Sequence, residues 1–83
     1  MAFVYVLCSG RTGGFYIGFS ANPEARLDDH NQGKVKSTRN LRPWSLVYRE
    51  EFADAISARK RERKLKSMKS HAYIQSLIDA QSG

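Results

Sequence analysis

An isolated carboxylate within a basic stretch is the feature of this sequence that most suggests chemistry. Helical spacing places Glu62 in line with Ala55, Ala58, Leu65 and Met68, which would form the inward stripe of a helix. An ionised carboxylate on such an apolar face is costly unless a cation compensates it. An ion pair with a neighbouring base and a bound metal ion explain the position equally well from spacing alone.

A second pair of residues with chemical potential lies earlier in the chain. Arg26 and His30 are four residues apart, so on a helix both project from one face. A guanidinium suits bidentate contact with phosphate oxygens and stays charged when negative charge builds up on phosphorus. The alternative for Arg26 is a surface salt bridge with Asp29 or Glu24, which adds little stability. His30 taken by itself is explained as a structural histidine.

Two tyrosines fall within β-branched and aromatic runs that predict strands. By itself, a strand tyrosine such as Tyr5 or Tyr16 is more often a packing residue than a catalytic one. Gly18 is more informative, because glycine inside a strand often marks the close approach of another group. It suggests a pocket beside Tyr16.

Turn and cap residues define the first half of the predicted fold. Residues 3–8 and 15–19 predict a β-hairpin, joined by a glycine-rich turn over 9–14. Asn22 and Pro23 then predict a helix that starts near Pro23 and ends around Gln32, before Gly33. The hairpin and the helix would carry the two tyrosines, Arg26 and His30.

The second half of the chain supplies a loop, a strand and two helices. Residues 33–43 are polar and basic and predict a binding loop, and 44–52 predict a third strand. Asp54 can cap a helix that extends to Lys69, and Ser70 can cap a last helix through Ala80. The expected fold is α+β, with a small three-stranded antiparallel sheet flanked by helices in the order ββαβαα.

The charge balance indicates an anionic partner. The chain has 14 Lys and Arg against 8 Asp and Glu, a formal net charge of +6. Nucleic acid is the partner we expect, although a solvated helix face that keeps the protein soluble is the commoner explanation of a charge run. The side chains expected to contact phosphates are Lys34, Lys36, Arg39, Arg42, Arg59, Arg63 and Lys66.

Length and composition limit the remaining classes. The 83 residues predict one domain over 1–83, since half of so short a chain could not bury a core. Its single cysteine, Cys8, excludes an internal disulfide, and no spacing suggests zinc. No apolar run approaches the ~20 residues of a membrane helix, and no signal peptide begins the chain. We expect a soluble cytoplasmic protein that binds neither a membrane nor a small-molecule substrate.

Several motifs taken together carry a family resemblance. Val4-Tyr5-Val6, Tyr16-Ile17-Gly18, Arg26, His30 and Glu62 occur in an order and spacing that resemble the GIY-YIG nuclease family. The likeness covers nearly the whole chain and is strongest to small standalone bacterial members, related to the N-terminal incision domain of the excision-repair endonuclease. The first signature departs from the pattern, because its glycine and isoleucine are both replaced by valine. His30 stands at a position that varies in the family.

The resemblance implies a metal-dependent endonuclease that hydrolyses DNA phosphodiester bonds. Glu62 would be the protein ligand of one divalent ion, Mg²⁺ or Mn²⁺, with substrate phosphate and waters completing the shell. Tyr5, with Tyr16 and His30, would orient or deprotonate the attacking water, and Arg26 would offset charge on the phosphoryl group. Such an enzyme would be structure-selective or nonspecific, with a role in DNA repair or recombination.

Two other functions stay open at this point. The chain could be an inactive module that only binds nucleic acid, or an accessory subunit that docks through Trp44 and its last helix. Charge does not separate these from a nuclease, but a pure binder has no need of a carboxylate facing a phosphate. The presence of both Arg26 and Glu62 therefore favours the nuclease, with DNA as substrate and targeting left to DNA shape or a partner protein.

Overall fold

The computed structural model describes residues 1–82 and confirms the predicted order of elements. Within these residues, none of the helices has the length and apolar character that crossing a membrane demands. The elements are β1 (Ala2–Ser9), β2 (Phe15–Ser20), α1 (Pro23–Asn31), the 3₁₀ turn η1 (Arg39–Leu41), β3 (Trp44–Phe52), α2 (Ala55–Met68) and α3 (His71–Ser82).

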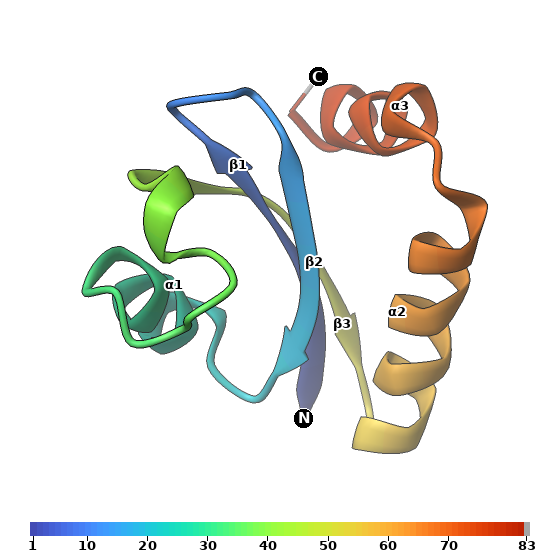
Figure 1. The fold of residues 1–83 in the computed structure, drawn as a ribbon. Helices are drawn as coiled ribbons and strands as arrows, with labels where there is room; N and C mark the ends of the chain where they lie inside the picture. Colours follow the sequence, from blue (N-terminus) through green and yellow to red (C-terminus); the bar gives the residue numbers. More distant parts are fainter. Residues whose placement is uncertain (83) are drawn as a thin grey trace.

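The three strands form one antiparallel sheet between two layers of helix. Their order is β2-β1-β3, so β1 is central and β2 is an edge strand. Figure 1 shows α1 and the loop that follows it on one face of the sheet, and α2 and α3 on the other. The α+β fold expected from the sequence is therefore confirmed.

Strand alternation divides the side chains of β1 between two hydrophobic clusters. Val4 and Val6 face the α2/α3 side, where they pack with Ala58, Leu65 and Ile74. The intervening residues face α1, and this second cluster consists of Tyr5, Leu7 and Trp44, with Tyr16, Leu27, Leu41 and Leu46 against it. The period of two in a strand thus assigns Tyr5 to the α1 face and its neighbours to the opposite core.

A register shift in β3 keeps both clusters filled. Val6 pairs with Tyr48, but Leu7 pairs with Leu46, so Val47 is the extra residue of a bulge. Without the shift, Leu46 and Tyr48 would face the same side. Instead Leu46 packs on the α1 side with Trp44, while Tyr48 is buried on the α2/α3 side.

Side-chain caps begin the helices where the sequence predicts. The Asn22 side chain accepts a hydrogen bond from the Ala25 amide, Asp54 accepts from Ser57, and Ser70 accepts from Tyr73. Gly33 follows the end of α1 with a φ of +79°, in the left-handed region that favours glycine. These three starts and one stop confirm the cap assignments made from the sequence.

Three details of the predicted elements were wrong. The last helix continues to Ser82 rather than ending at Ala80. The loop over residues 33–43 contains a turn of 3₁₀ helix. Ala55 and Met68 do not belong to an inward stripe, because both are exposed, and Met68 keeps 42% of its surface in solvent. Only the middle of α2 covers the sheet, through Ala58 and Leu65.

Candidate active site

Gly18 allows the Tyr5 side chain to reach the edge of the sheet. The two residues face each other across the β1–β2 ladder, and a Cβ at Gly18 would lie only 2.6 Å from the Tyr5 hydroxyl oxygen. The close approach that a strand glycine suggested is therefore present, and the approaching group is Tyr5. Because β2 is the edge strand, the ring of Tyr5 crosses it toward the rim of the sheet.

Tyr5, Tyr16 and His30 form an aromatic cluster under α1. The His30 ring centroid lies 4.7 Å from that of Tyr16 and 6.5 Å from that of Tyr5, and the two tyrosine centroids are 6.4 Å apart. Trp44 closes the other side, 6.4 Å from His30. His30 is fully buried, with 0% of its surface exposed. Three of the residues predicted for the site thus lie together.

The hydrogen bonds of Thr38 define the tautomer of His30. Thr38 Oγ1 lies 2.8 Å from His30 Nδ1, and its hydroxyl donates to the carbonyl of Val35 at 3.3 Å. Since a hydroxyl donates a single proton, Thr38 then accepts the hydrogen bond from Nδ1–H. His30 Nε2 is left as an unprotonated acceptor, and it is buried without a hydrogen-bond partner.

The pKa values of His30 and Tyr5 shift in opposite directions. Burial, and then the nearby charge of Arg26, lower the pKa of His30 below its ordinary value of 6.5. Burial raises the pKa of Tyr5 above 10.0, although a hydrogen bond from Arg26 opposes the shift. At neutral pH the cluster therefore holds a neutral imidazole and a neutral phenol.

Arg26 connects α1 to the tyrosine cluster. Its guanidinium lies near enough to Tyr5 for the two groups to influence each other's pKa, and it pairs with Asp29 at 3.1 Å. The salt bridge weighed from the sequence is thus present, but Asp29 does not occupy the whole guanidinium. Lys34 shares the same carboxylate at 3.6 Å. Arg26 is half-exposed, so it can also meet a ligand from solvent.

Glu62 comes to the same place from α2. Its carboxylate adds a small contribution to the rise in the pKa of Tyr5, and only 18% of its side chain is exposed. Lys66 Nζ lies 3.2 Å from the Glu62 carboxylate and 5.9 Å from the Tyr16 ring centroid. The ion pair considered for Glu62 is therefore formed, with a base one helical turn away.

The donor atoms present suit a hard divalent cation with an incomplete protein shell. Among residues 1–82, no three His, Cys, Asp or Glu side chains gather where they could hold a metal ion. Glu62 nevertheless attracts a cation, since the ammonium of Lys66 already contacts it. Mg²⁺ keeps several waters and often binds through one or two carboxylates together with phosphate oxygens. A single carboxylate with a guanidinium nearby is compatible with such binding, with the remaining ligands supplied by waters and a substrate.

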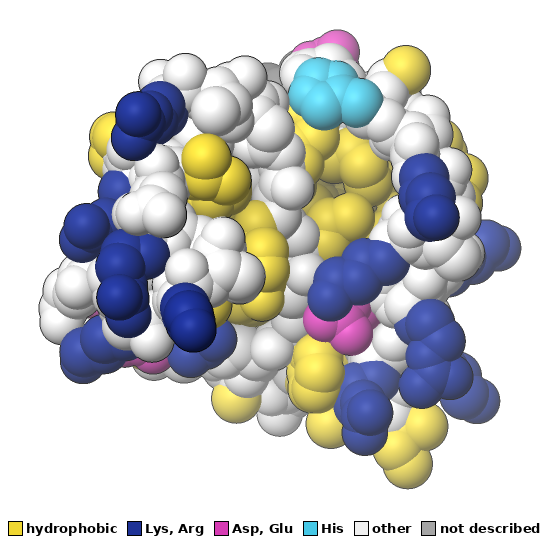
Figure 2. All heavy atoms as spheres, in the orientation of Figure 1, with side chains coloured by type: hydrophobic (Ala, Val, Ile, Leu, Met, Phe, Trp, Pro, Cys, Tyr) yellow, Lys and Arg dark blue, Asp and Glu magenta, His cyan; other side chains and the backbone are white. Residues whose placement is uncertain are grey.

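The predicted phosphate-contacting bases fall into two groups. Lys34, Lys36, Arg39 and Arg42 follow α1, whereas Arg59, Arg63 and Lys66 lie on α2. Figure 2 shows Lys and Arg side chains gathered on these two sides, with hydrophobic and acidic side chains on the surface between them. Arg59 lies over the Phe19 ring at 5.8 Å and Lys66 pairs with Glu62, while Lys36 and Arg63 are exposed.

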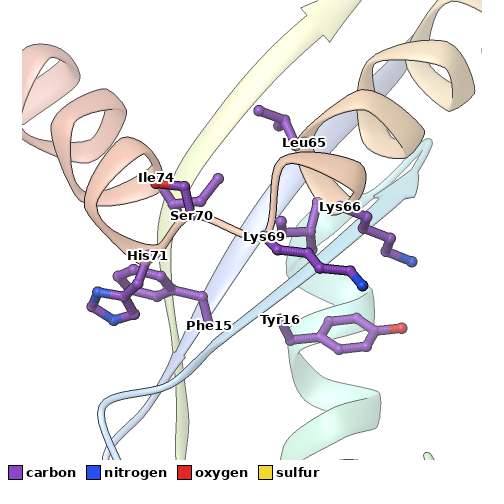
Figure 3. Close-up of a pocket in the computed structure, with 9 residues that line it drawn as sticks. Phe15, Tyr16, Leu65, Lys66, Lys69, Ser70, His71 and Ile74 are labelled. Atoms are coloured by element: carbon purple, nitrogen blue, oxygen red, sulfur yellow. The ribbon is translucent and has the colours of Figure 1, made fainter.

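A mostly apolar hollow of about 370 Å³ adjoins Tyr16 on the α2 side. Figure 3 shows the stacked rings of Phe15 and His71 at one end and the side chains of Lys66 and Lys69 near Tyr16 at the other. The two stacked rings are 4.2 Å apart and nearly parallel. Tyr16 is consequently accessible from the surface, in contrast to buried Tyr5.

Sequence reasoning missed the contribution of Thr38. This residue is buried, bonds to His30, and accepts a hydrogen bond from Trp44 Nε1 through its carbonyl at 3.0 Å. Nothing in the polar loop distinguishes Thr38 from its neighbours, because its place depends on tertiary contacts. Lys66 was predicted as a phosphate contact, and its pairing with Glu62 could have been anticipated from the i, i+4 spacing.

Comparisons with known proteins identify the family of this chain. The family model described as the GIY-YIG catalytic domain matches residues 1–74. A UPF0213 protein of Syntrophus aciditrophicus is 41% identical over 69 residues, which cover 80% of this chain and 77% of that protein. A UPF0213 protein of Natronomonas pharaonis is 36% identical over 83 residues, covering 98% of this chain and 94% of that one.

A solved structure resembles the chain over its full length. The solution NMR structure of a UPF0213 protein from Bacillus halodurans aligns with a TM-score of 0.60 and 28% sequence identity, covering 100% of this chain and 88% of that one. The GIY-YIG family is one of nucleases, and the names of the relatives specify no substrate or pathway. The chain belongs to the GIY-YIG family, among its small standalone UPF0213 proteins.

Proposed function

We propose that this protein is a DNA endonuclease that hydrolyses phosphodiester bonds with one divalent metal ion, Mg²⁺ or Mn²⁺, held by Glu62. The observation that carries the proposal is geometric: the rings of Tyr5, Tyr16 and His30 lie together, and Lys66 contacts both the Glu62 carboxylate and the Tyr16 ring. Arg26, on α1, opposes the rise in the pKa of Tyr5. These contacts support a site built from a guanidinium, two phenols and a carboxylate at the edge of the sheet.

Each of these groups has a role that follows from its chemistry. Arg26 stays protonated and offsets negative charge on the phosphoryl oxygens as the water oxygen bonds to phosphorus. Tyr5 is a neutral phenol at neutral pH, so it orients the water or the phosphate through hydrogen bonds. A divalent ion bound by Glu62 supplies Lewis-acid stabilisation of the leaving oxygen.

His30 is the group that we assign to accept the proton of the attacking water. Its Nε2 carries a free lone pair, its imidazole is neutral at pH 7, and Thr38 fixes the tautomer. Because His30 Nε2 is buried and has no hydrogen-bond partner, the proton would reach it by way of a water molecule that enters beside Tyr16, whose ring lies nearest. As the P–O bond to the leaving oxygen breaks, that oxygen takes a proton from solvent.

The wider setting of the activity is part of the same proposal. The DNA backbone would be contacted by the seven bases predicted from the sequence, which gives affinity without reading the base sequence. They are Lys34, Lys36, Arg39, Arg42, Arg59, Arg63 and Lys66. We therefore propose structure-selective or nonspecific cutting in cytoplasmic DNA repair or recombination, with targeting by DNA shape or by a partner protein.

The proposal is tested by incubating pure protein with labelled linear, nicked and branched DNAs in Mg²⁺, Mn²⁺ or EDTA. We expect cleavage that requires the metal and is lost in Glu62→Gln and Arg26→Ala, because each variant removes one charge from the site. Matched thermal unfolding curves would show that both variants fold. Cleavage by Glu62→Gln at the wild-type rate would overturn the assignment of the metal site.

A nucleic-acid-binding module without catalysis is the second candidate. One observation favours it: the ammonium of Lys66 already occupies the carboxylate of Glu62. Under this alternative the ion pair is structural and no added metal displaces it. Tight DNA binding combined with the absence of cleavage of every DNA in the panel, in either metal, would support the module over the nuclease.

A further inference from the structure

Three arginines from separate segments surround one hollow near the end of α1. Arg11 comes from the β1–β2 turn, Arg39 begins η1, and Arg42 follows it. The hollow has a volume of about 480 Å³ and its walls are completed by Asn31, Asn40 and Pro43. It is mostly polar, and among the described residues that line it the three arginines are the charged ones.

Neutral backbone acceptors hold each guanidinium in place. Arg11 donates from Nη1 to the carbonyl of Asn40 at 3.0 Å, Arg39 from Nε to that of Gly33 at 2.9 Å, and Arg42 from Nε to that of Arg39 at 2.7 Å. A carbonyl fixes the direction of a guanidinium but does not neutralise its charge. The three side chains are thus positioned and still fully cationic.

Gly33 makes room for Arg42. A Cβ at Gly33 would lie 2.9 Å from Arg42 Nη1, and the residue has a φ of +79° that disfavours any side chain. Arg42 Nη1 also approaches the carbonyl of Asn31 at 3.4 Å. Arg42 therefore packs closely against the end of α1.

The surrounding backbone is braced by hydrogen bonds between the turn and the loop. Ser9 Oγ donates to the carbonyl of Leu41 at 2.6 Å, and the Gly10 amide donates to that of Pro43 at 2.7 Å. The Asn31 side chain bonds both the amide and the carbonyl of Trp44, at 2.7 and 3.0 Å. The hollow is consequently formed before any ligand arrives, which lowers the entropic cost of binding.

The charge in the hollow is uncompensated by the protein. Within residues 1–82, Arg11, Arg39 and Arg42 take part in none of the ion pairs, whereas Arg26, Arg49 and Arg61 each pair with a carboxylate. Three like charges around one space repel each other, and an anion between them would relieve that repulsion. Guanidinium forks suit phosphate oxygens in particular.

We propose that the hollow of Arg11, Arg39 and Arg42 binds one phosphate of the DNA backbone, distinct from the phosphate that is cut. This inference rests on the proposed function, because it supplies a second anchor for the same substrate. The three side chains are exposed and the hollow is open, which suits a strand that passes across it. The loop that carries Arg39 and Arg42 also carries Thr38, the partner of His30, so this anchor is directly connected to the site.

The test measures DNA binding in a protein that cannot cut. Fluorescence anisotropy with labelled DNA in EDTA would compare Glu62→Gln alone with the same chain carrying Arg11→Gln or, as the matched control, Lys64→Gln. Each added change removes one positive charge, but Lys64 is exposed on α2, away from the hollow. We expect Arg11→Gln to weaken binding about tenfold or more, and the slope of log affinity against log salt to fall by about one. The control should change affinity less than about threefold.

A second variant and a second ligand keep the result interpretable. Arg11→Lys retains the positive charge but loses the guanidinium fork, so we expect it to bind DNA with an affinity between those of the parent chain and Arg11→Gln. If Arg11→Gln does not fold, Arg11→Lys takes its place in the test. Equal affinities for Arg11→Gln and Lys64→Gln would overturn the proposal, as would inorganic phosphate that binds at the hollow without competing with DNA. DNA binding is measured without metal, so the result for the hollow does not depend on catalysis. An absence of cleavage would contradict the proposed activity but not the proposed phosphate site.

Discussion

The two faces of the sheet differ in the kind of group that they bury. On the α2/α3 face, the fully buried side chains of the core are aliphatic, with Val4, Val6, Ala58 and Leu65 at its centre. On the α1 face, the buried set includes a phenol, an imidazole and a hydroxyl, from Tyr5, His30 and Thr38. The central strand β1 contributes to both sets through its alternation, with Val4 and Val6 on one face and Tyr5 on the other.

The difference is one reason why we propose the α1 face for the chemistry. Burying a polar group without a partner costs free energy, and His30 Nε2 is such a group. Burial of aliphatic side chains on the α2/α3 face stabilises the fold. This stabilisation offsets the cost of holding polar groups away from water on the α1 face. Glu62 and Lys66 belong to α2 but contribute to the candidate site on the other face. Their side chains reach the edge strand β2, where Lys66 contacts the Tyr16 ring.

Leu65→Ala should affect the aliphatic face alone. Leu65 is buried between α2 and the sheet, so the change should lower the free energy of unfolding by about 2–5 kcal/mol. Urea unfolding followed by circular dichroism would measure the loss. The cleavage rate per folded molecule should stay within about twofold at low temperature. A large fall in that rate would mean that the aliphatic face also affects cleavage directly.

The dependence of cleavage on pH sharpens the assignment of the α1 face. Since His30 must be neutral to accept a proton and its pKa lies below 6.5, activity should fall with acid only below that pH and stay level from about 7 to 9. If a Tyr5 phenolate were the base, activity would continue to rise toward pH 10 and above, because the pKa of Tyr5 is raised.

The same measurement needs a control for unfolding. The unfolded chain binds a proton on His30 near pH 6.5, whereas the folded chain resists protonation until lower pH. The unfolded state therefore holds more protons in this window, and stability falls as pH decreases through it. Circular dichroism at each pH would separate loss of fold from loss of the base.

Lys66→Met is expected to have the smallest effect of these changes, a modest rise in metal affinity. It tests the contact between α2 and the aromatic cluster, at the edge where the two faces of the sheet meet. The ammonium of Lys66 competes with a divalent ion for Glu62, and a half-exposed ion pair of this kind is worth at most about 1 kcal/mol. Titration calorimetry should show Mn²⁺ binding up to about fivefold tighter in the variant. Weaker Mn²⁺ binding would mean that Lys66 helps to form the metal site.

Local signals in the sequence predicted most of the fold. The third strand has the expected bounds, Trp44 to Phe52, and Pro23 and Asp54 begin helices through backbone effects that depend on a few neighbouring residues. The shift at Val47 was not predictable, because both registers of β3 leave an apolar pattern. The exposure of Met68 was not predicted either. Helical spacing identifies the inward face of a helix, but it does not show how far the sheet beneath that face extends.

The site was less accessible from local patterns. Tyr5 and Tyr16 gave no chemical signal of their own and were identified by resemblance, whereas the structure shows that both lie against His30. The arginine hollow could not be predicted, because Arg11 is distant in sequence from Arg39 and Arg42 and only the fold brings them together. Tertiary contacts decide such groupings.

The most direct test of the account is the Tyr5→Phe variant, which removes one oxygen atom from the α1 face. The Tyr5 hydroxyl interacts with the half-exposed Arg26, so removing it should change the free energy of unfolding by only about 1 kcal/mol. Val6→Ala, one residue away on the other face, is the matched control and should lower stability but not the rate per folded molecule. We predict a fall of about 100-fold or more in metal-dependent cleavage for Tyr5→Phe. A wild-type cleavage rate in Tyr5→Phe would contradict the central claim that this face performs the chemistry.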